Sequence, residues 1–145
     1  RLIGLPGDSI QFTSGDLYLN NSKIKKEKLT LNLSIKCGSS DINTDIYKET
    51  LPNGVEYIIA NRKGYTMLNS DEFIVPKDHY FFLGDNRDCS KDSRFLAEVG
   101  YVQSNNLVGK AQILFFSSDK EKGSFLKFWK WNKSIRFDRF FDKIK

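Results

Sequence analysis

Apolar and polar residues alternate with a period of two along much of the N-terminal part of the chain, which predicts β-strands. The clearest run is KLTLNLSIK, residues 28–36, where four apolar side chains fall on one face of an extended chain. We expect this run to form a half-buried strand, and the polar residues 37–44 to form a loop after it. Gly15 and the sequence Leu-Pro-Asn-Gly at 51–54 have the residue types of tight turns, so each predicts a β-hairpin.

Later segments are apolar without alternation. Residues 73–75 predict a short strand, and HYFFL, residues 79–83, predicts a buried one. Between the hairpins and these strands, residues 61–72 have the composition of a loop. LVGKAQILFF, residues 107–116, predicts a final long strand with Gly109 at a β-bulge. The body is therefore expected to be all-β, with mainly antiparallel sheets.

The C-terminal residues 124–145, called the basic tail below, follow a different pattern. Four apolar residues recur at the spacing i, i+3, i+4, i+7, which is that of the apolar face of a helix. These residues are Phe137, Phe140, Phe141 and Ile144. Trp129 and Trp131 precede them among lysines. We therefore expect a short C-terminal helix in the basic tail.

The net charge of +5 is carried by the basic tail, which holds seven Lys or Arg residues against two Asp. The rest of the chain is balanced, so a nucleic-acid surface spread over the domain is excluded, and we expect no nucleic-acid partner. Two interpretations of the tail stay open. Its apolar face can pack on the β body, or Trp129, Trp131 and the lysines can contact the headgroups of an anionic membrane. Membrane contact is our hypothesis.

The length of 145 residues is enough for one domain with a hydrophobic core. No apolar run has the roughly 20 residues that a membrane-spanning helix needs. A metal site is disfavoured, because His79 is the only histidine and no Cys-x-x-Cys pair occurs. Cys37 and Cys89 are compatible with one disulfide or with two free thiols, and their number does not decide between them. We favour free thiols, with Cys89 filling space as a small side chain.

The densest group of polar side chains is GDNRDCSKDSR, residues 84–94, which we call the motif loop. Gly, Asp, Asn and Ser favour turns, so a solvated turn is the simplest interpretation. The apolar strand predicted directly before it argues for more, since loops on a rigid scaffold often carry functional groups. A second candidate segment opens the chain and has the composition of a capped tight turn. Its turn residues are Gly4, Pro6, Gly7 and Asp8.

The order of three segments, RLIGLPGD, then PKDHYFFLGDNRDCSKDSR, then NLVGKA, resembles that of the bacterial type I signal peptidases. In that family a Lys-Arg pair precedes a Gly-x-Pro-Gly-Asp turn, and a Gly-Asp-Asn-Arg-Asp-x-Ser-x-Asp-Ser-Arg segment follows later. The second motif is complete here, from Gly84 to Arg94. The chain departs from the family pattern after it, with Phe95-Leu96 where an aromatic-glycine pair is common and Gln103 where a proline is common.

The resemblance implies a catalytic β core with a variable β extension. On this basis residues 1–25 and 63–123 form an incomplete core domain, residues 26–62 form the extension, and the basic tail follows. It also implies a serine endopeptidase that removes signal peptides after small-x-small sites, such as Ala-x-Ala, from secreted precursor proteins. The expected location is the outer, periplasmic face of the bacterial cytoplasmic membrane. Neither a metal nor an organic cofactor is implied.

Members of this family work through a Ser-Lys dyad, in which a lysine of lowered pKa activates the serine. By resemblance the lysine would directly precede Arg1 and the serine would lie further upstream. No catalytic residue of the dyad is therefore expected in this chain. We interpret the chain as a C-terminal fragment that is inactive by itself.

The resemblance assigns supporting roles to residues that are present. Ser90 would lie beside the dyad lysine and orient its amine by a hydrogen bond. Asp85 would pair with Arg1 and hold the segment that carries the lysine. Asp92 would pair with Arg94 and hold the loop. The other supporting residues of the motif loop are Asn86, Arg87, Asp88 and Ser93.

Two alternatives remain open from the sequence. The chain could belong to another Ser-Lys peptidase, such as a self-cleaving repressor, which would have no membrane anchor upstream of Arg1. It could instead be a non-enzymatic β module that binds anionic membrane or nucleic acid through the basic tail. His79 is interpreted as a strand residue rather than a catalytic base, since the resembled family uses no histidine there.

Overall fold

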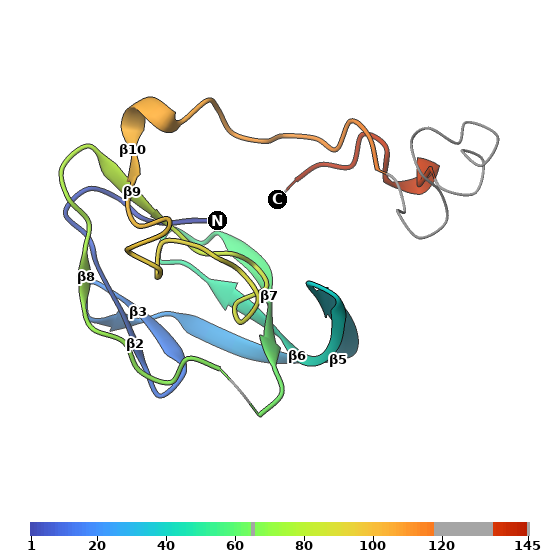
Figure 1. Ribbon diagram of the computed structural model, residues 1–145, viewed down its shortest axis with the longest axis horizontal. Coiled ribbons are helices and arrows are strands. Elements are labelled where there is room, and N and C mark those ends of the chain that lie inside the picture. Colours follow the sequence, from blue (N-terminus) through green and yellow to red (C-terminus); the bar gives the residue numbers. More distant parts are fainter. Residues whose placement is uncertain (65, 118–134, 145) are drawn as a thin grey trace. The chain divides into compact units, whose positions relative to one another are not determined.

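The computed structural model describes residues 1–64, 66–117 and 135–144. The chain divides into two compact units, Arg1–Leu107 and Val108–Lys145. The all-β prediction is confirmed, because the first unit consists of β-strands joined by turns and loops (Figure 1). Within the described ranges, no helix has the length and apolar character needed to cross a bilayer.

The strands of the first unit form three sheets within the described part of the chain. In chain order they are β1 (Leu2–Gly4), β2 (Ser9–Thr13), β3 (Asp16–Leu19), β4 (Ser22–Lys23), β5 (Lys25–Cys37), β6 (Ser40–Thr50), β7 (Glu56–Arg62), β8 (Phe73–Ile74), β9 (His79–Phe82) and β10 (Val102–Gln103). The strand orders are β1-β9-β10, β4-β3-β2-β8 and β5-β6-β7. We call the third of these the extension sheet. All paired strands within the sheets are antiparallel.

Turn chemistry determines where the first strands reverse. Between β2 and β3, Ser14 and Gly15 have φ angles of 51° and 79°. Between β3 and β4, Asn20 and Asn21 have φ angles of 51° and 60°. Positive φ at both central residues is typical of the tight turns that match the twist of paired strands. The hairpin predicted at Gly15 is confirmed, and so is the β6–β7 hairpin at residues 51–54.

The core lies where the sheets meet, and its centre is β9. Phe81 and Ile10 are fully buried, and Leu83 and Val75 are nearly so, which confirms the buried strand predicted over 79–83. Gly4 of β1 packs directly on this core, since a Cβ there would lie 2.5 Å from Cδ1 of Ile10. A side chain at this position would therefore have to displace the buried Ile10 of β2.

The chain turns at Pro6 and Gly7, between β1 and β2. Gly7 has a φ of 91°, a conformation that favours glycine. Asp8 closes the turn, because its carboxylate accepts hydrogen bonds from the Leu5 N–H and from the Asn20 amide, both at 2.8 Å. This turn fixes the direction in which β1 leaves the core.

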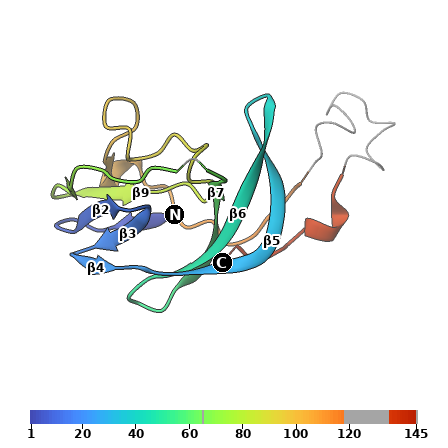
Figure 2. The same ribbon diagram turned by 90° about the horizontal axis from the view of Figure 1, so that it is seen from below.

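The extension sheet contains a long, curved β5–β6 hairpin, which Figure 2 shows rising beside the other sheets. Cys37 pairs with Ser40, so only residues 38 and 39 form the turn, and the loop predicted over 37–44 is wrong. The polar composition of 40–44 misled the prediction, because one face of this strand is solvated while Ile42 and Thr44 are buried on the other.

The apolar face of β5 is less buried than its alternation predicts. Leu31 and Leu33 are 54% and 50% exposed, so the strand over 28–36 is confirmed but its half-buried state is wrong there. The pairing register also shifts between Lys28 and Asn32. No residue of this run belongs to the hydrophobic core cluster, because the hairpin extends beyond it.

The second unit contains little regular structure in its described residues, 108–117 and 135–144. The long strand predicted over 107–116 is wrong: Ile113 forms an isolated antiparallel bridge with Lys143. The short C-terminal helix is a single 3-10 turn, Phe137–Arg139. The predicted apolar helical face is not formed, since Phe141 has a φ of 62° and donates its N–H to the carbonyl of Leu114 at 2.7 Å. Trp129 and Trp131 lie outside the described residues.

Candidate functional site

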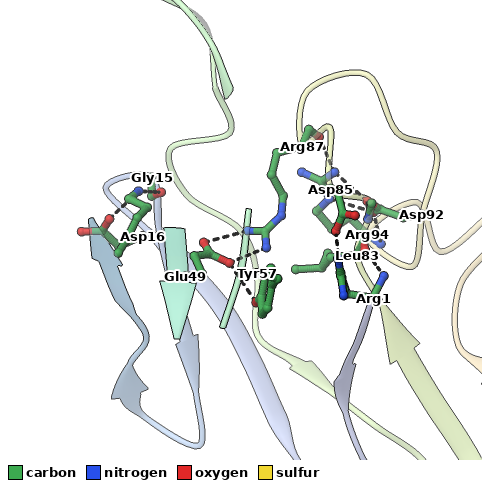
Figure 3. Close-up of polar contacts among 12 residues, drawn as sticks. Arg1, Gly15, Asp16, Glu49, Tyr57, Leu83, Asp85, Arg87, Asp92 and Arg94 are labelled. Atoms are coloured by element: carbon green, nitrogen blue, oxygen red, sulfur yellow. Dashed lines mark hydrogen bonds and ion pairs between the residues drawn. The ribbon is translucent and has the colours of Figure 1, made fainter. Parts of the chain in front are cut away.

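The start of the chain and the end of β9 lie side by side at the entrance to the motif loop (Figure 3). The Leu83 N–H donates to the Arg1 carbonyl at 2.9 Å, and the Arg1 α-amino group donates to the Leu83 carbonyl at 2.6 Å. These bonds continue the β1–β9 pairing by one residue. Backbone immediately before Arg1 would therefore leave this ladder next to Gly84.

Arg1 and Asp85 form an ion pair, with Nε 3.0 Å from Oδ1. Their side chains are 28% and 50% exposed, so water screens the attraction and its contribution to folding is about 1 kcal/mol or less. The Arg1 guanidinium also lies over the Tyr57 ring, 5.5 Å from its centroid. Asp85 and Tyr57 thus orient the Arg1 side chain together, although the ion pair itself adds little to stability.

Asp92 and Arg94 form a second and much less exposed pair. Nε and Nη2 of Arg94 each donate to a carboxylate oxygen of Asp92 at 2.8 Å, and both side chains are about 95% buried. The Gly84 N–H also donates to Asp92 at 2.8 Å. Arg94 further donates to the Arg87 carbonyl. This pair therefore ties the end of the motif loop to its beginning and middle.

Ser93 and Ser90 have different surroundings. Ser93 is fully buried and continues the pairing of β9, since the Phe82 N–H donates to its Oγ at 3.0 Å. The Ser90 side chain lies against Gly84: a Cβ built on Gly84 would be 1.7 Å from Ser90 Oγ. Gly84 directly follows the Leu83 that bonds Arg1, so Ser90 packs on the residue next to the one that holds the start of the chain.

The first half of the motif loop is attached to β7 rather than to β9. The Ala60 N–H donates to the Asp85 carbonyl, and the Arg87 N–H donates to the Ala60 carbonyl, both at 2.9 Å. Ala60 and Asn86 therefore form a parallel bridge. Two residues further along β7, the Arg62 N–H donates to the Asp88 carboxylate at 2.6 Å.

A buried cluster of three side chains lies between this half of the loop and the extension sheet. Nη1 and Nη2 of Arg87 donate to the two carboxylate oxygens of Glu49 at 3.0 and 2.5 Å. The Tyr57 hydroxyl donates to the same carboxylate at 2.9 Å. Burial, and then the neighbouring Glu49 carboxylate, raise the pKa of Tyr57, so its hydroxyl stays protonated as the donor.

Glu49 and Tyr57 were not identified from the sequence. Glu49 stands in the polar run Tyr-Lys-Glu-Thr, and nothing in that run separates a buried glutamate from a solvated one. The signal lies in the register, because Glu49 of β6 is paired directly with Tyr57 of β7. To recognise Glu49 as buried, one must know both the register of the β6–β7 hairpin and the position of Arg87.

Cys37 and Cys89 form a disulfide, with Cα atoms 5.6 Å apart. The preference for free thiols, and for Cys89 as a space-filling side chain, is therefore wrong. The β5–β6 hairpin is longer than predicted, because residues 40–44 belong to β6 rather than to a loop. Its tip therefore reaches the motif loop, where Cys37 bonds Cys89. The disulfide joins the tip of this hairpin to the residue directly before Ser90.

His79 is the first residue of β9, and its Nδ1 lies 2.8 Å from the Lys77 carbonyl, in agreement with the strand role predicted for it.

Known proteins resemble this chain in the same segments. The family model of signal peptidase, peptidase S26, matches residues 1–116. The signal peptidase I proteins of Rickettsia typhi and Rickettsia bellii are 39% and 40% identical over 162 aligned positions, which cover 99% of this chain. The alignments cover 58% and 53% of those relatives, so the chain spans about half the length of the curated relatives it matches.

A solved structure is also similar, the crystal structure of a signal peptidase I from Enterococcus faecalis V583. It is 25% identical, with a TM-score of 0.37, and the match covers 75% of this chain and 77% of that one. The range matched by the family model contains both the turn at Gly7 and the complete motif loop. The resemblance carried by these motifs is thereby confirmed, and the chain belongs to the signal peptidase family, peptidase S26.

Proposed function

We propose that this chain is the part of a type I signal peptidase that positions a Ser-Lys catalytic pair carried by residues preceding Arg1. The observation that carries the proposal is the ladder between Arg1 and Leu83, which holds the start of the chain next to Gly84, the residue on which Ser90 packs. The family membership removes the need for the two alternatives, a self-cleaving repressor-type peptidase and a non-enzymatic binding module.

The proposed reaction is hydrolysis of the peptide bond after a small-x-small site in a secreted precursor. A neutral lysine amine accepts the proton of the serine hydroxyl while the serine oxygen attacks the scissile carbonyl. A lysine is neutral near physiological pH only where burial or nearby positive charge lowers its pKa. The proposal therefore requires such an environment beside Arg1, whose guanidinium supplies one nearby positive charge.

Each supporting residue then has a role in this reaction. Ser90 orients the lysine amine by a hydrogen bond, and its packing on Gly84 keeps its hydroxyl at the entrance to the loop. Asp85 holds Arg1, and with it the backbone that carries the lysine. Asp92 and Arg94 keep the loop closed. Asn86, Arg87, Asp88 and Ser93 attach the loop to the two strands on either side of it.

Asp85→Ala tests this assignment in the full-length protein. We expect cleavage of a precursor peptide with an Ala-x-Ala site to fall about 10-fold or more in kcat/KM, because small displacements of a catalytic group are costly. The melting temperature should change little, since the pair with Arg1 is exposed. Peptide cleavage followed by mass spectrometry, together with thermal unfolding, measures both.

Asp71→Ala is the matched control, because Asp71 is an exposed carboxylate of the same unit outside the motif loop. It should cleave as the wild type does. Wild-type kcat/KM in Asp85→Ala would refute the role of the ion pair. A wild-type protein that cleaves no signal-peptide precursor would refute the proposed function itself.

We further propose that the protein acts at the outer face of the cytoplasmic membrane and that the basic tail contacts the lipid surface. Its positive charge and its aromatic residues, Trp129 and Trp131 among them, are suited to anionic headgroups. We expect the chain to co-sediment with vesicles containing anionic lipid, and to lose most of this binding on deletion of residues 124–145. Equal binding with and without the tail would contradict the hypothesis. Vesicles of neutral lipid are the control.

A further inference from the structure

The extension sheet, rather than the core, supports the first half of the motif loop. Asp85, Asn86 and Arg87 follow the backbone of β7 at Ala60, and Asp88 is bound two residues further along the same strand, at Arg62. The catalytic role proposed above, however, concerns the other edge of the loop, where Arg1 and Ser90 lie. If the extension sheet affects that edge, a chain of side-chain contacts must connect β7 and the motif loop with Arg1.

Glu49 is the side chain placed to do so. It is 1% exposed, and its carboxylate binds both Arg87, from the motif loop, and Tyr57, from β7. Tyr57 in turn lies under the guanidinium of Arg1. The path therefore runs from Arg87 through Glu49 and Tyr57 to Arg1, and Figure 3 shows Glu49 joined to both Arg87 and Tyr57.

Stability alone does not account for such an arrangement. A buried ion pair loses the hydration of both charges, and replacing the whole pair by apolar residues is often neutral or stabilising. What a two-pronged contact between a guanidinium and a carboxylate does supply is a defined orientation. Through Arg87, Glu49 orients the loop that carries Ser90. Through Tyr57, it orients the ring on which the Arg1 guanidinium lies.

We propose that Glu49 is a positioning residue for the active site: through Arg87 and Tyr57 it sets Arg1 and the motif loop at the spacing the dyad lysine requires. The inference rests on the proposed function. It assigns to the extension sheet a part in catalysis, because a residue of β6 then controls the geometry at the entrance to the loop.

The test compares a single and a double variant of the full-length protein. Glu49→Gln keeps the shape of the side chain and removes its charge. We expect kcat for an Ala-x-Ala precursor peptide to fall about 10-fold or more, with KM within about two-fold of wild type, because positioning affects the reacting groups rather than substrate binding. Glu56→Gln, an exposed glutamate of β7 that pairs with Lys48, is the control and should leave kcat unchanged.

The double variant Glu49→Leu, Arg87→Met separates positioning from stability. Its melting temperature should return to near the wild-type value, because both buried charges are gone. Its kcat should stay low. The backbone amide at position 87, which donates to the Ala60 carbonyl in the wild type, should exchange its hydrogen faster than the wild-type amide does. Amide exchange by NMR does not depend on activity, so it tests the positioning even if the proposed function fails.

Two outcomes would overturn the inference. One is a wild-type kcat in Glu49→Gln, provided that this variant is folded. The other is a double variant in which kcat and amide protection both recover along with the melting temperature, since the cluster would then act on stability only. A wild-type protein that is folded but inactive on every precursor peptide would count against the proposed function and not against the role of Glu49, because amide exchange tests that role separately.

Discussion

Gly84→Ala is expected to disrupt the motif loop more than any other single methyl group added in the described part of the first unit. A Cβ at Gly84 would lie 1.7 Å from Oγ and 2.2 Å from Cβ of Ser90, distances at which atoms overlap. Ser90 must therefore move. The Ser90 N–H, bonded to the Asn86 carbonyl at 2.9 Å, and the adjacent disulfide at Cys89 resist that movement.

The expected loss of stability is about 1–3 kcal/mol, the usual cost of extra atoms in a packed site. For a protein of this size that corresponds to a fall of about 3 to 10 °C in melting temperature. Gly109→Ala is the control, since no atom lies within 4 Å of a Cβ built there. Thermal unfolding of the two variants side by side measures the difference.

A second substitution tests whether the overlap with Ser90 is the cause. The double variant Gly84→Ala, Ser90→Gly removes the obstructing side chain, so its melting temperature should recover a large part of the loss. Its peptidase activity should not recover, because the proposed partner of the lysine amine is then absent. If Gly84→Ala melts with the wild type, the close packing of Ser90 on the loop entrance is contradicted.

The features that were predictable from the sequence are those whose information is local. Gly15 and the Leu-Pro-Asn-Gly turn specify hairpins through the φ angles that they permit, and both hairpins are present. The continuous apolar run ending at Leu83 is recognisable without its neighbours, and its Phe81 and Leu83 side chains are buried. The ion pairs of Arg1 with Asp85 and of Asp92 with Arg94 came from the family resemblance, and the structure contains both contacts.

The features that were missed depend on contacts between distant segments. The burial of Glu49 is decided by Arg87, which lies on a different loop. The exposure of Leu31 is decided by how far the β5–β6 hairpin extends beyond the core, which alternation alone does not report. The segment 107–116 has the composition of a strand, yet a strand also needs a partner along its length. Among the described residues of the second unit, its backbone bonds are scattered ones to residues 141–144.

The disulfide between Cys37 and Cys89 belongs to the same group, because it depends on the length of the hairpin. Its removal should lower the stability of the protein more than the substitutions at Gly84 or Asp85 do. The bridge spans 52 positions of sequence, and closing a loop of that length in the unfolded chain is worth about 4 kcal/mol in the chain-entropy model, with about 2–4 kcal/mol typical of measurements.

We therefore expect the variant Cys37→Ser, Cys89→Ser to unfold at a clearly lower urea concentration than the oxidised wild type, with a free energy of unfolding lower by about 2–4 kcal/mol. Reductant should shift the wild type to the same midpoint and leave the double variant unchanged, which separates loss of the bridge from the effect of serine. Because Cys89 directly precedes Ser90, the reduced enzyme should also lose activity before it unfolds.

A thiol titration that finds two free cysteines in the folded protein, or an unfolding midpoint insensitive to reductant, would contradict the bridge. Tethering Ser90 would then rest on the Asn86 carbonyl and the packing against Gly84 alone.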